Sequence, residues 1–300
     1  MKSEIVRDHW RAMMAAAVAD PDQAPDRVRD RVERYWPGLT SEPGGVDYLA
    51  VDVHGLPALW AIPKGSSEEH VILGVHGGGG VSGSIYTHRK LFAHMAEATG
   101  VRALIVEYSR RGYPAPLDDA LTAYRWLLGR EIDPGRIAIA GDSLGGNLSI
   151  SAILRAREAG LPTPAALFLM SPWVDMTVGD KTFETNRETE EFFYRDVVLA
   201  LASTYLSGAD PTDPFASPLH AELNALPPTY IQVGGDETLL GESARFAEKA
   251  RAAGVDVRLD IFPGQLHTFQ MAAGNSAEST DAIERFATWA RPKLGLAHGE

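Results

Sequence analysis

The sequence predicts an α/β protein with a mostly parallel central sheet of about eight strands and helices on both faces. Two observations lead to this prediction. After residue 70, short apolar runs rich in β-branched residues alternate with longer helix-like stretches. Before residue 70, two apolar runs flank His54-Gly55, which is a hairpin pattern. The alternating part gives parallel strands covered by helices, and the hairpin adds antiparallel strands at one edge.

Composition narrows the classes of protein. The chain has 300 residues, of which 45% are hydrophobic and 23% charged, as in ordinary globular proteins. This length suits one large α/β domain or two smaller ones. A net charge of −12 argues against a nucleic-acid partner, because affinity for phosphate backbones comes largely from lysine and arginine. The sequence has no cysteine, which excludes disulfides, thiolate catalysis and cysteine-ligated metals.

The sequence shows neither a signal-peptide pattern near its start nor an apolar run of 18 residues. We therefore expect no membrane span and a cytoplasmic location. Residues 1–40 carry apolar residues at roughly helical spacing, punctuated by prolines, and no strand pattern. We expect helices there that pack on another part of the molecule. The runs 46–53 and 56–62 form the predicted hairpin.

The alternating part of the chain supplies the remaining strands. We expect them at 70–75, 101–108, 136–140, 165–170, 229–233 and 257–262. Helices are expected between them at 91–99, 118–129, 147–159 and 243–253. Residues 176–220 break the alternation with a helical pattern and no strand, which suggests an insertion over the C-terminal end of the sheet. Open α/β sheets bind their ligands at that end.

The segment G-D-S-L-G at residues 141–145 follows a strand and precedes a helix, which is the context that a G-x-S-x-G nucleophile turn requires. A Cβ at Gly141 or Gly145 would crowd the sharp turn. The turn lifts the Ser143 hydroxyl clear of the sheet, near the positive end of the helix. The alternative is a glycine-rich turn with an incidental serine. We identify Ser143 as the candidate nucleophile.

A serine nucleophile needs a base, and the base needs a carboxylate that orients it. In this arrangement the acid and then the histidine follow the serine along the chain. His267 lies in the loop after the last strand pattern, and Asp236 comes directly after the strand before it. Glu237 competes with Asp236. We favour Asp236 because it is the first acid after the glycine pair that ends the strand.

The segment H-G-G-G-G at residues 76–80 follows another predicted strand. Acyl transfer creates an oxyanion, which preorganised N–H groups must meet. We expect those donors to be the backbone N–H groups of Gly78, Gly79 and Leu144. The histidines at 88 and 94 lack metal-ligand spacing, and we expect neither a metal nor a cofactor.

Together with D-E-T-L-L at 236–240 and F-P-G-Q-L-H-T-F at 262–269, these motifs resemble the bacterial hormone-sensitive-lipase-like esterases, which have the α/β-hydrolase fold. The resemblance covers roughly residues 40–292 and is greatest to a branch with monoterpene lactone hydrolases and N-acetyl-hydrolases. It implies ester hydrolysis without a cofactor, and a cap from N-terminal helices and a later insertion. The cap would comprise 1–40 and about 176–220, the latter inserted in a catalytic domain of 41–300.

The resemblance leaves the substrate open. Met14, Trp173, Phe193 and Tyr205 are our candidates for lining the substrate pocket, with plain packing as the alternative for each. The family usually has alanine where this chain has Leu144, so we expect that side chain to narrow the acyl site; otherwise it fills a space in the core.

The predicted function is hydrolysis of small or medium acyl esters through an acyl-enzyme. A lactonase or small-amide deacetylase would use the same residues, and a non-catalytic receptor is an alternative of another class. We expect a small-molecule ester or lactone as partner, no nucleic acid, and a monomer or homodimer.

Overall fold

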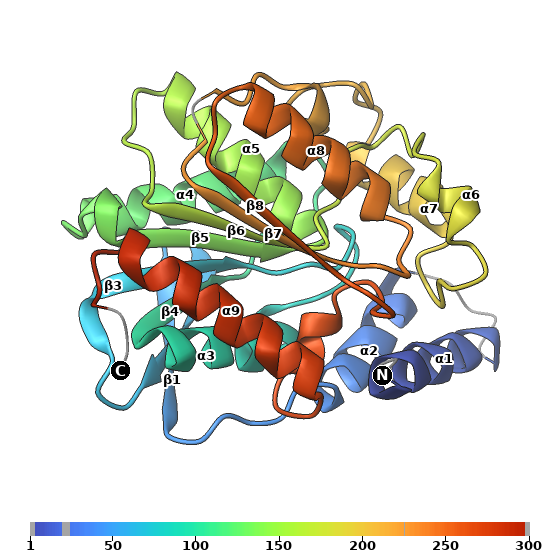
Figure 1. Cartoon of the computed structure of the whole chain (residues 1–300), viewed down its shortest axis with the longest axis horizontal. Helices are drawn as coiled ribbons and strands as arrows, with labels where there is room; N and C mark the ends of the chain where they lie inside the picture. Colours follow the sequence, from blue (N-terminus) through green and yellow to red (C-terminus); the bar gives the residue numbers. More distant parts are fainter. Residues whose placement is uncertain (1–3, 20–24, 225, 298–300) are drawn as a thin grey trace.

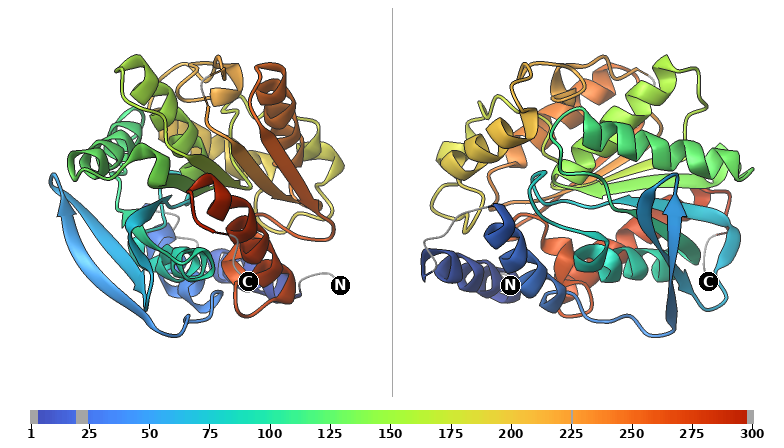
Figure 2. Two further views of the ribbon diagram at one scale, coloured as in Figure 1. Left: turned by 60° about the vertical axis from the view of Figure 1, so that its left-hand side comes forward. Right: turned by 180° about the vertical axis from the view of Figure 1, so that it is seen from behind.

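The computed structural model describes residues 4–19, 25–224 and 226–297. Within them one sheet of eight strands has the order β1-β2-β4-β3-β5-β6-β7-β8. The strands are β1 (Val46–Val53), β2 (Leu56–Pro63), β3 (Ser67–Val75), β4 (Val101–Val106), β5 (Ile137–Asp142), β6 (Ala166–Met170), β7 (Thr229–Gly234) and β8 (Val257–Phe262). β1, β2 and β4 pair antiparallel, and all other neighbours pair parallel. The predicted α/β class and the hairpin at one edge are confirmed (Figure 2).

Helices cover both faces of this sheet (Figure 1). One layer consists of α4 (Ala115–Gly129), α5 (Leu144–Glu158) and α8 (Leu240–Ala252), and the other of α3 (Ile85–Thr99) and α9 (Ala277–Lys293). Strand residues alternate between the two resulting cores. On β5, Ile137 and Ile139 join the core beneath α4, α5 and α8, whereas Ala138 and Ala140 join the core beneath α3 and α9. Both faces are apolar because both are buried, which explains the continuous apolar runs of the sequence.

The remaining helices gather at the C-terminal end of the parallel strands. They are α1 (Glu4–Ala19), α2 (Pro25–Tyr35), α6 (Thr182–Thr185) and α7 (Arg195–Leu206). Figures 1 and 2 place α1 and α2 at the same end of the molecule as α6 and α7. Short 3-10 turns complete the fold: η1 (Trp36–Gly38), η2 (Pro134–Arg136), η3 (Pro218–His220) and η4 (Phe269–Ala272). Among the described helices, none is long and apolar enough to cross a membrane.

Candidate active site

The turn between β5 and α5 presents a single serine. Ser143 has φ 52° and ψ −121°, a conformation that residues with a side chain rarely adopt. A Cβ at Gly141 would lie 2.3 Å from the carbonyl oxygen of Gly145, and one at Gly145 would lie 2.1 Å from that of Val75. The predicted crowding of the turn is therefore confirmed. The glycines let the turn form, and the turn holds the serine in its strained conformation.

A histidine and an acid meet this serine from loops far along the chain. The Nε2 atom of His267 lies 3.0 Å from the Ser143 Oγ, and its Nδ1 atom lies 3.2 Å from Oε1 of Glu237. His267 and Ser143 are each 4% exposed, and Glu237 is fully buried. The histidine therefore lies between a hydroxyl and a carboxylate, as in a Ser-His-acid arrangement.

The acid in this arrangement is not the one expected from the sequence. Asp236 lies one residue before Glu237, but its Oδ2 atom is 3.5 Å from the Arg7 guanidinium, whereas the carboxylate on His267 Nδ1 is that of Glu237. Glu237 instead turns inward, where its Oε2 accepts hydrogen bonds from the Ser171 hydroxyl and the Gly234 N–H, both at 2.7 Å. Our choice of Asp236 is thus corrected in favour of Glu237, because these buried donors fix the glutamate beside the histidine.

Ser171 is a site residue that sequence reasoning missed. Its hydroxyl donates to Glu237 and accepts from the backbone N–H of Thr268 at 3.1 Å. It therefore links the acid to the residue that follows His267. Ser171 is the first residue after β6 and has φ 46°, a backbone conformation that the sequence does not show. The serine directly after a predicted strand, at the same edge of the sheet, was the available signal.

The glycine loop after β3 adopts left-handed backbone conformations that suit glycine. The φ values are 122° at Gly78 and 63° at Gly79, and a Cβ on Gly78 would lie 2.0 Å from the Ser82 carbonyl oxygen. Both glycines line the same cavity as Ser143. Within the described part of the chain, their N–H groups and that of Leu144 have no hydrogen-bond acceptor. Such donors are what an oxyanion requires.

Asp142 fastens the glycine loop to the serine turn. Its Oδ1 accepts from the Gly77 N–H at 2.8 Å, and its Oδ2 lies 3.3 Å from Nε2 of His88. Burial opposes charge on Asp142, but His88 and the Gly77 N–H keep the pKa of its carboxyl below the usual value. The structure thus gives Asp142 a bracing position between the glycine loop and the serine turn.

A cavity of about 380 Å³ opens above Ser143. It is lined mostly by apolar side chains, among them the predicted Met14 and Phe193. Sequence reasoning did not place Trp10 or Leu201 there, although both line it. Their signal is weak, because an apolar residue on a helix packs against the core as often as it faces a pocket.

Two predicted pocket residues lie elsewhere. Trp173 is fully buried behind Phe193, with the ring centroids 6.0 Å apart at 88°, and its Nε1 donates to the Asp175 carbonyl oxygen. Tyr205 is 1% exposed and packs edge-on against Tyr113. Neither lines the cavity. These aromatic rings support the walls rather than form them, so both are corrected to packing residues.

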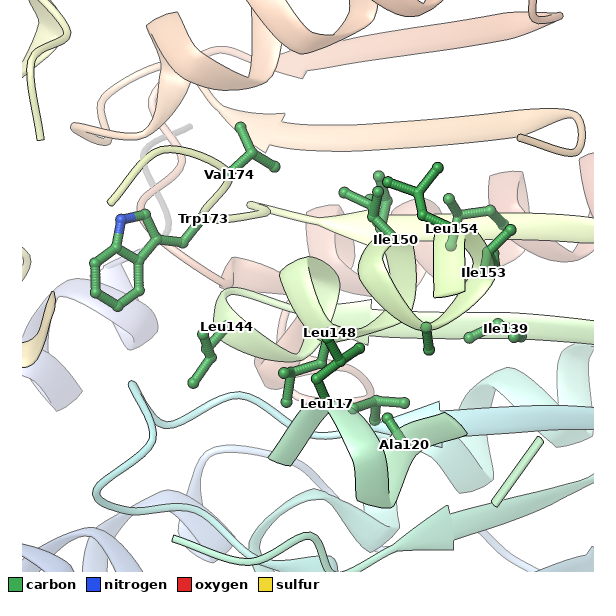
Figure 3. Packing of buried hydrophobic residues seen from close by; sticks show 14 of the residues in the cluster. Leu117, Ala120, Ile139, Leu144, Leu148, Ile150, Ile153, Leu154, Trp173 and Val174 are labelled. Atoms are coloured by element: carbon green, nitrogen blue, oxygen red, sulfur yellow. The ribbon is translucent and has the colours of Figure 1, made fainter. Parts of the chain in front are cut away.

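The side chain of Leu144 also lies outside the cavity. It is fully buried in the core beneath α4 and α5. Figure 3 shows it on the same side of α5 as Leu148, which lies beside Leu117 of α4. Its Cδ2 atom lies 3.3 Å from the point where a Cβ on Gly80 would stand. The expected narrowing of the acyl site is therefore not observed, and the side chain fills the core beside the glycine loop.

Fold and site together define a serine hydrolase of the α/β type. The chain belongs to the alpha/beta hydrolase fold family, whose model matches residues 72–271. A solved esterase of the bacterial hormone-sensitive lipase family is 37% identical, with a TM-score of 0.93 over 98% of this chain and 100% of that one. A solved esterase/lipase from an uncultured bacterium is 34% identical, with a TM-score of 0.90 over 99% and 100%.

Curated relatives agree with the solved structures. An acetyl-hydrolase of Streptomyces hygroscopicus is 34% identical over 89% of this chain and 88% of its own length. An esterase of Acinetobacter venetianus is also 34% identical, over 75% of this chain and 76% of its own. The predicted resemblance to the hormone-sensitive-lipase-like esterases is thus confirmed.

Proposed function

We propose that Ser143, His267 and Glu237 form the catalytic triad of this chain, with the N–H groups of Gly78, Gly79 and Leu144 as the oxyanion hole. The chain itself is a carboxylic-ester hydrolase of the serine class. The observation that carries the assignment of residues is the continuous contact from the Ser143 Oγ through His267 to the buried Glu237 carboxylate.

Each group has a defined part in the proposed reaction. His267 Nε2 takes the proton of Ser143 as Oγ attacks the ester carbonyl, and the oxyanion forms beside the glycine loop. Glu237 keeps Nδ1 protonated and stabilises the imidazolium. The imidazolium then protonates the leaving alcohol. Water enters, gives its proton to His267 and hydrolyses the acyl-enzyme by the same steps in reverse.

The cap assignment is supported by the cavity lining. Side chains of α1 and α2, such as Met14 and Val32, share the cavity with α7 side chains such as Leu201. Residues 1–40 and 176–220 would therefore cover the catalytic domain of 41–300. The apolar lining favours esters of small or medium acyl chains. A lactone or a small amide would meet the same groups and stays an alternative. The cytoplasmic location and the monomeric or homodimeric state stay predictions.

The test replaces each proposed group in turn. Ser143→Ala and His267→Ala should each lower kcat on p-nitrophenyl acetate by about 10⁴ or more, with the double variant little worse, because the groups act as a unit. A fluorophosphonate probe should label the wild type at Ser143, whereas a non-catalytic receptor would stay unlabelled. Near-normal turnover in either alanine variant would refute the assignment.

Glu237 and Asp236 provide a matched pair. Glu237→Gln should lower kcat by about 10³–10⁴, since an amide beside Nδ1 favours the wrong tautomer. Asp236→Asn, one residue away and facing Arg7, should lower it by less than about tenfold, because it alters only a partly exposed ion pair. The reverse order would restore Asp236 as the acid.

A further inference from the structure

One wall of the cavity is an aromatic ring that lies flat on the histidine. The ring centroids of Phe193 and His267 are 4.4 Å apart, and the two planes differ by only 11°. Phe193 is 3% exposed. A side chain that only lines a pocket does not need its ring to lie parallel to the imidazole of His267. Stacking of this kind restricts the histidine ring itself.

We propose that Phe193 is a positioning residue for His267: it holds the imidazole in the plane that joins Ser143 to Glu237 and favours the protonated ring. This inference rests on the proposed function, since it takes His267 as the general base. It assigns to Phe193 a role in the rate of turnover, beyond its place in the substrate cavity.

The catalytic cycle creates the need for such support. Once Ser143 is acylated, its Oγ has no proton to share, and His267 loses that hydrogen-bond partner. The ring is then held at Nδ1 by Glu237, at 3.2 Å, which is long for a hydrogen bond to a carboxylate. A phenyl ring packed on one face blocks rotation of the imidazole about its Cβ–Cγ bond. The ring therefore stays aligned for the second half of the reaction.

The face of the Phe193 ring also stabilises positive charge on His267. The face of an aromatic ring carries negative electrostatic potential, which attracts a cation placed over it. His267 becomes a cation each time it takes a proton from Ser143 or from water. Phe193 faces the imidazole plane directly, so the attraction acts where the positive charge forms. An aliphatic side chain of similar size would exclude water equally but would lack this attraction.

Phe193 is itself fixed by the loop that carries the acid. The Thr238 hydroxyl donates to the Phe193 carbonyl oxygen at 2.8 Å, and the Thr238 N–H donates to Glu190 at 3.2 Å. Trp173 packs edge-on against the Phe193 ring from behind. The segment that presents the stacking ring is thus tied to the residue next to Glu237, so acid and ring keep a fixed relation to His267.

Other charged groups around His267 must be considered in a pH profile. Glu237 contacts it directly, and Asp142 and Arg31 line the same cavity. Asp236 lies beside Glu237 in the acid loop and faces Arg7. A substitution at Phe193 alters none of these charged groups. A shift in the acid limb of the pH profile of kcat/KM would therefore result from loss of the stacked ring.

The experiment removes the ring and keeps its bulk. Phe193→Leu and Phe193→Met should lower kcat on p-nitrophenyl acetate about tenfold with little change in KM. The acid limb of kcat/KM should move to lower pH by about 0.5 unit, because loss of the cation–π attraction disfavours the imidazolium. Phe193→Tyr keeps the aromatic ring, so its kcat and the pH of its acid limb should stay close to those of the wild type. Absorbance is measured at the isosbestic wavelength of p-nitrophenol and its anion, so that ionisation of the product does not affect the measured rate.

Phe192→Leu is the matched control: this neighbouring ring lines the cavity and lies 6.0 Å from the Phe193 ring, but in the described part of the chain the ring stacked on His267 is that of Phe193. It should change KM and leave the acid limb in place. Titration with the fluorophosphonate probe gives the concentration of folded active sites. Two variants without the ring, Phe193→Leu and Phe193→Met, are used in case one of them does not fold. Ringless variants that change only KM would overturn the inference. Absence of ester turnover in the wild type would instead refute the proposed function.

Discussion

Leu144 shows how one residue can serve two purposes at once. Its backbone N–H lies at the start of α5 and would donate to the oxyanion in the proposed mechanism, a task that does not depend on the side chain. The side chain points the other way and is fully buried with Leu148 and Leu117. It also lies beside Gly80, so it packs directly behind the glycine loop. A larger residue after the nucleophile therefore need not restrict the substrate.

We expect Leu144→Ala to cost stability and to leave specificity unchanged. Removal of a fully buried leucine side chain costs about 2–5 kcal/mol, depending on how far the surrounding core can relax. The ratio of kcat/KM between acetyl and longer esters should stay within about twofold, because the side chain does not line the cavity. Urea unfolding and an acyl-length series on the same variant provide the measurements. A stable variant that prefers bulkier acyl groups would contradict this placement.

The acid of the proposed triad shows what could not be predicted from the sequence at the residue scale. Ser143 and His267 could be predicted, because each has a distinctive residue type at a strand end. Asp236 and Glu237 are adjacent carboxylates after the same strand, and nothing local separates them. The choice depends on the Ser171 hydroxyl and the Gly234 N–H, which meet Glu237 only after the chain has folded.

Among the elements, the first helix is fastened to the catalytic loops by an ion-pair cluster. The Arg7 guanidinium contacts Glu191 at 2.5 Å and Asp236 at 3.5 Å, and Arg11 also pairs with Glu191. Trp10, one helical turn from Arg7, stacks on Phe192 with ring centroids 4.9 Å apart at 9°. Charge and aromatic packing thus hold α1 against the segment that precedes α7.

Deletion of residues 1–24 should open the cavity and leave the sheet folded. Trp10, Met13 and Met14 would be lost from its lining, so KM should rise more for longer acyl esters than for acetyl esters. Ile5→Ala is the control, since that side chain lies on the same helix, is 46% exposed and does not line the cavity. Kinetics on an ester series and the circular dichroism of the truncated chain test this. Unchanged kinetics across the series would show that α1 is not part of the cap.

The elements of the central sheet were predictable, whereas the packing of the proposed cap was not. Each inner strand is an apolar run between helices, and β5 and β6 need no distant residue to be recognised. The helices of the proposed cap have apolar faces too, but their partners lie far away in the chain: Arg7 contacts a residue 184 positions later. Amphipathic spacing cannot show that Met14 of α1 faces the cavity rather than the core, and it does not apply to Trp173, which lies in the loop after β6.

At the scale of the whole molecule, the chain buries titratable groups beneath its active site. His76 is fully buried after β3, where its Nδ1 donates to the Gly77 carbonyl oxygen at 2.7 Å and its ring stacks on Tyr108. Its Nε2 has no partner among the described residues. Burial lowers the pKa of His76 from 6.5 to about 4, with further contributions from nearby charges. The fold therefore requires this imidazole to be neutral.

This requirement predicts an acid limit to stability. Because the folded pKa lies below the unfolded value, His76 contributes stability fully above pH 6.5, and that contribution is lost as pH falls towards about 4. The loss amounts to about 2 kcal/mol by pH 5 and approaches about 3 kcal/mol near pH 4.

His76→Asn can still donate to the Gly77 carbonyl but does not titrate. Its free energy of unfolding should therefore fall less steeply than that of the wild type between pH 7.5 and pH 5. Urea unfolding of both proteins at the two pH values measures the difference, in which other titrating groups, including the buried Glu242, largely cancel. Parallel losses in the two proteins would mean that another group sets the acid limit.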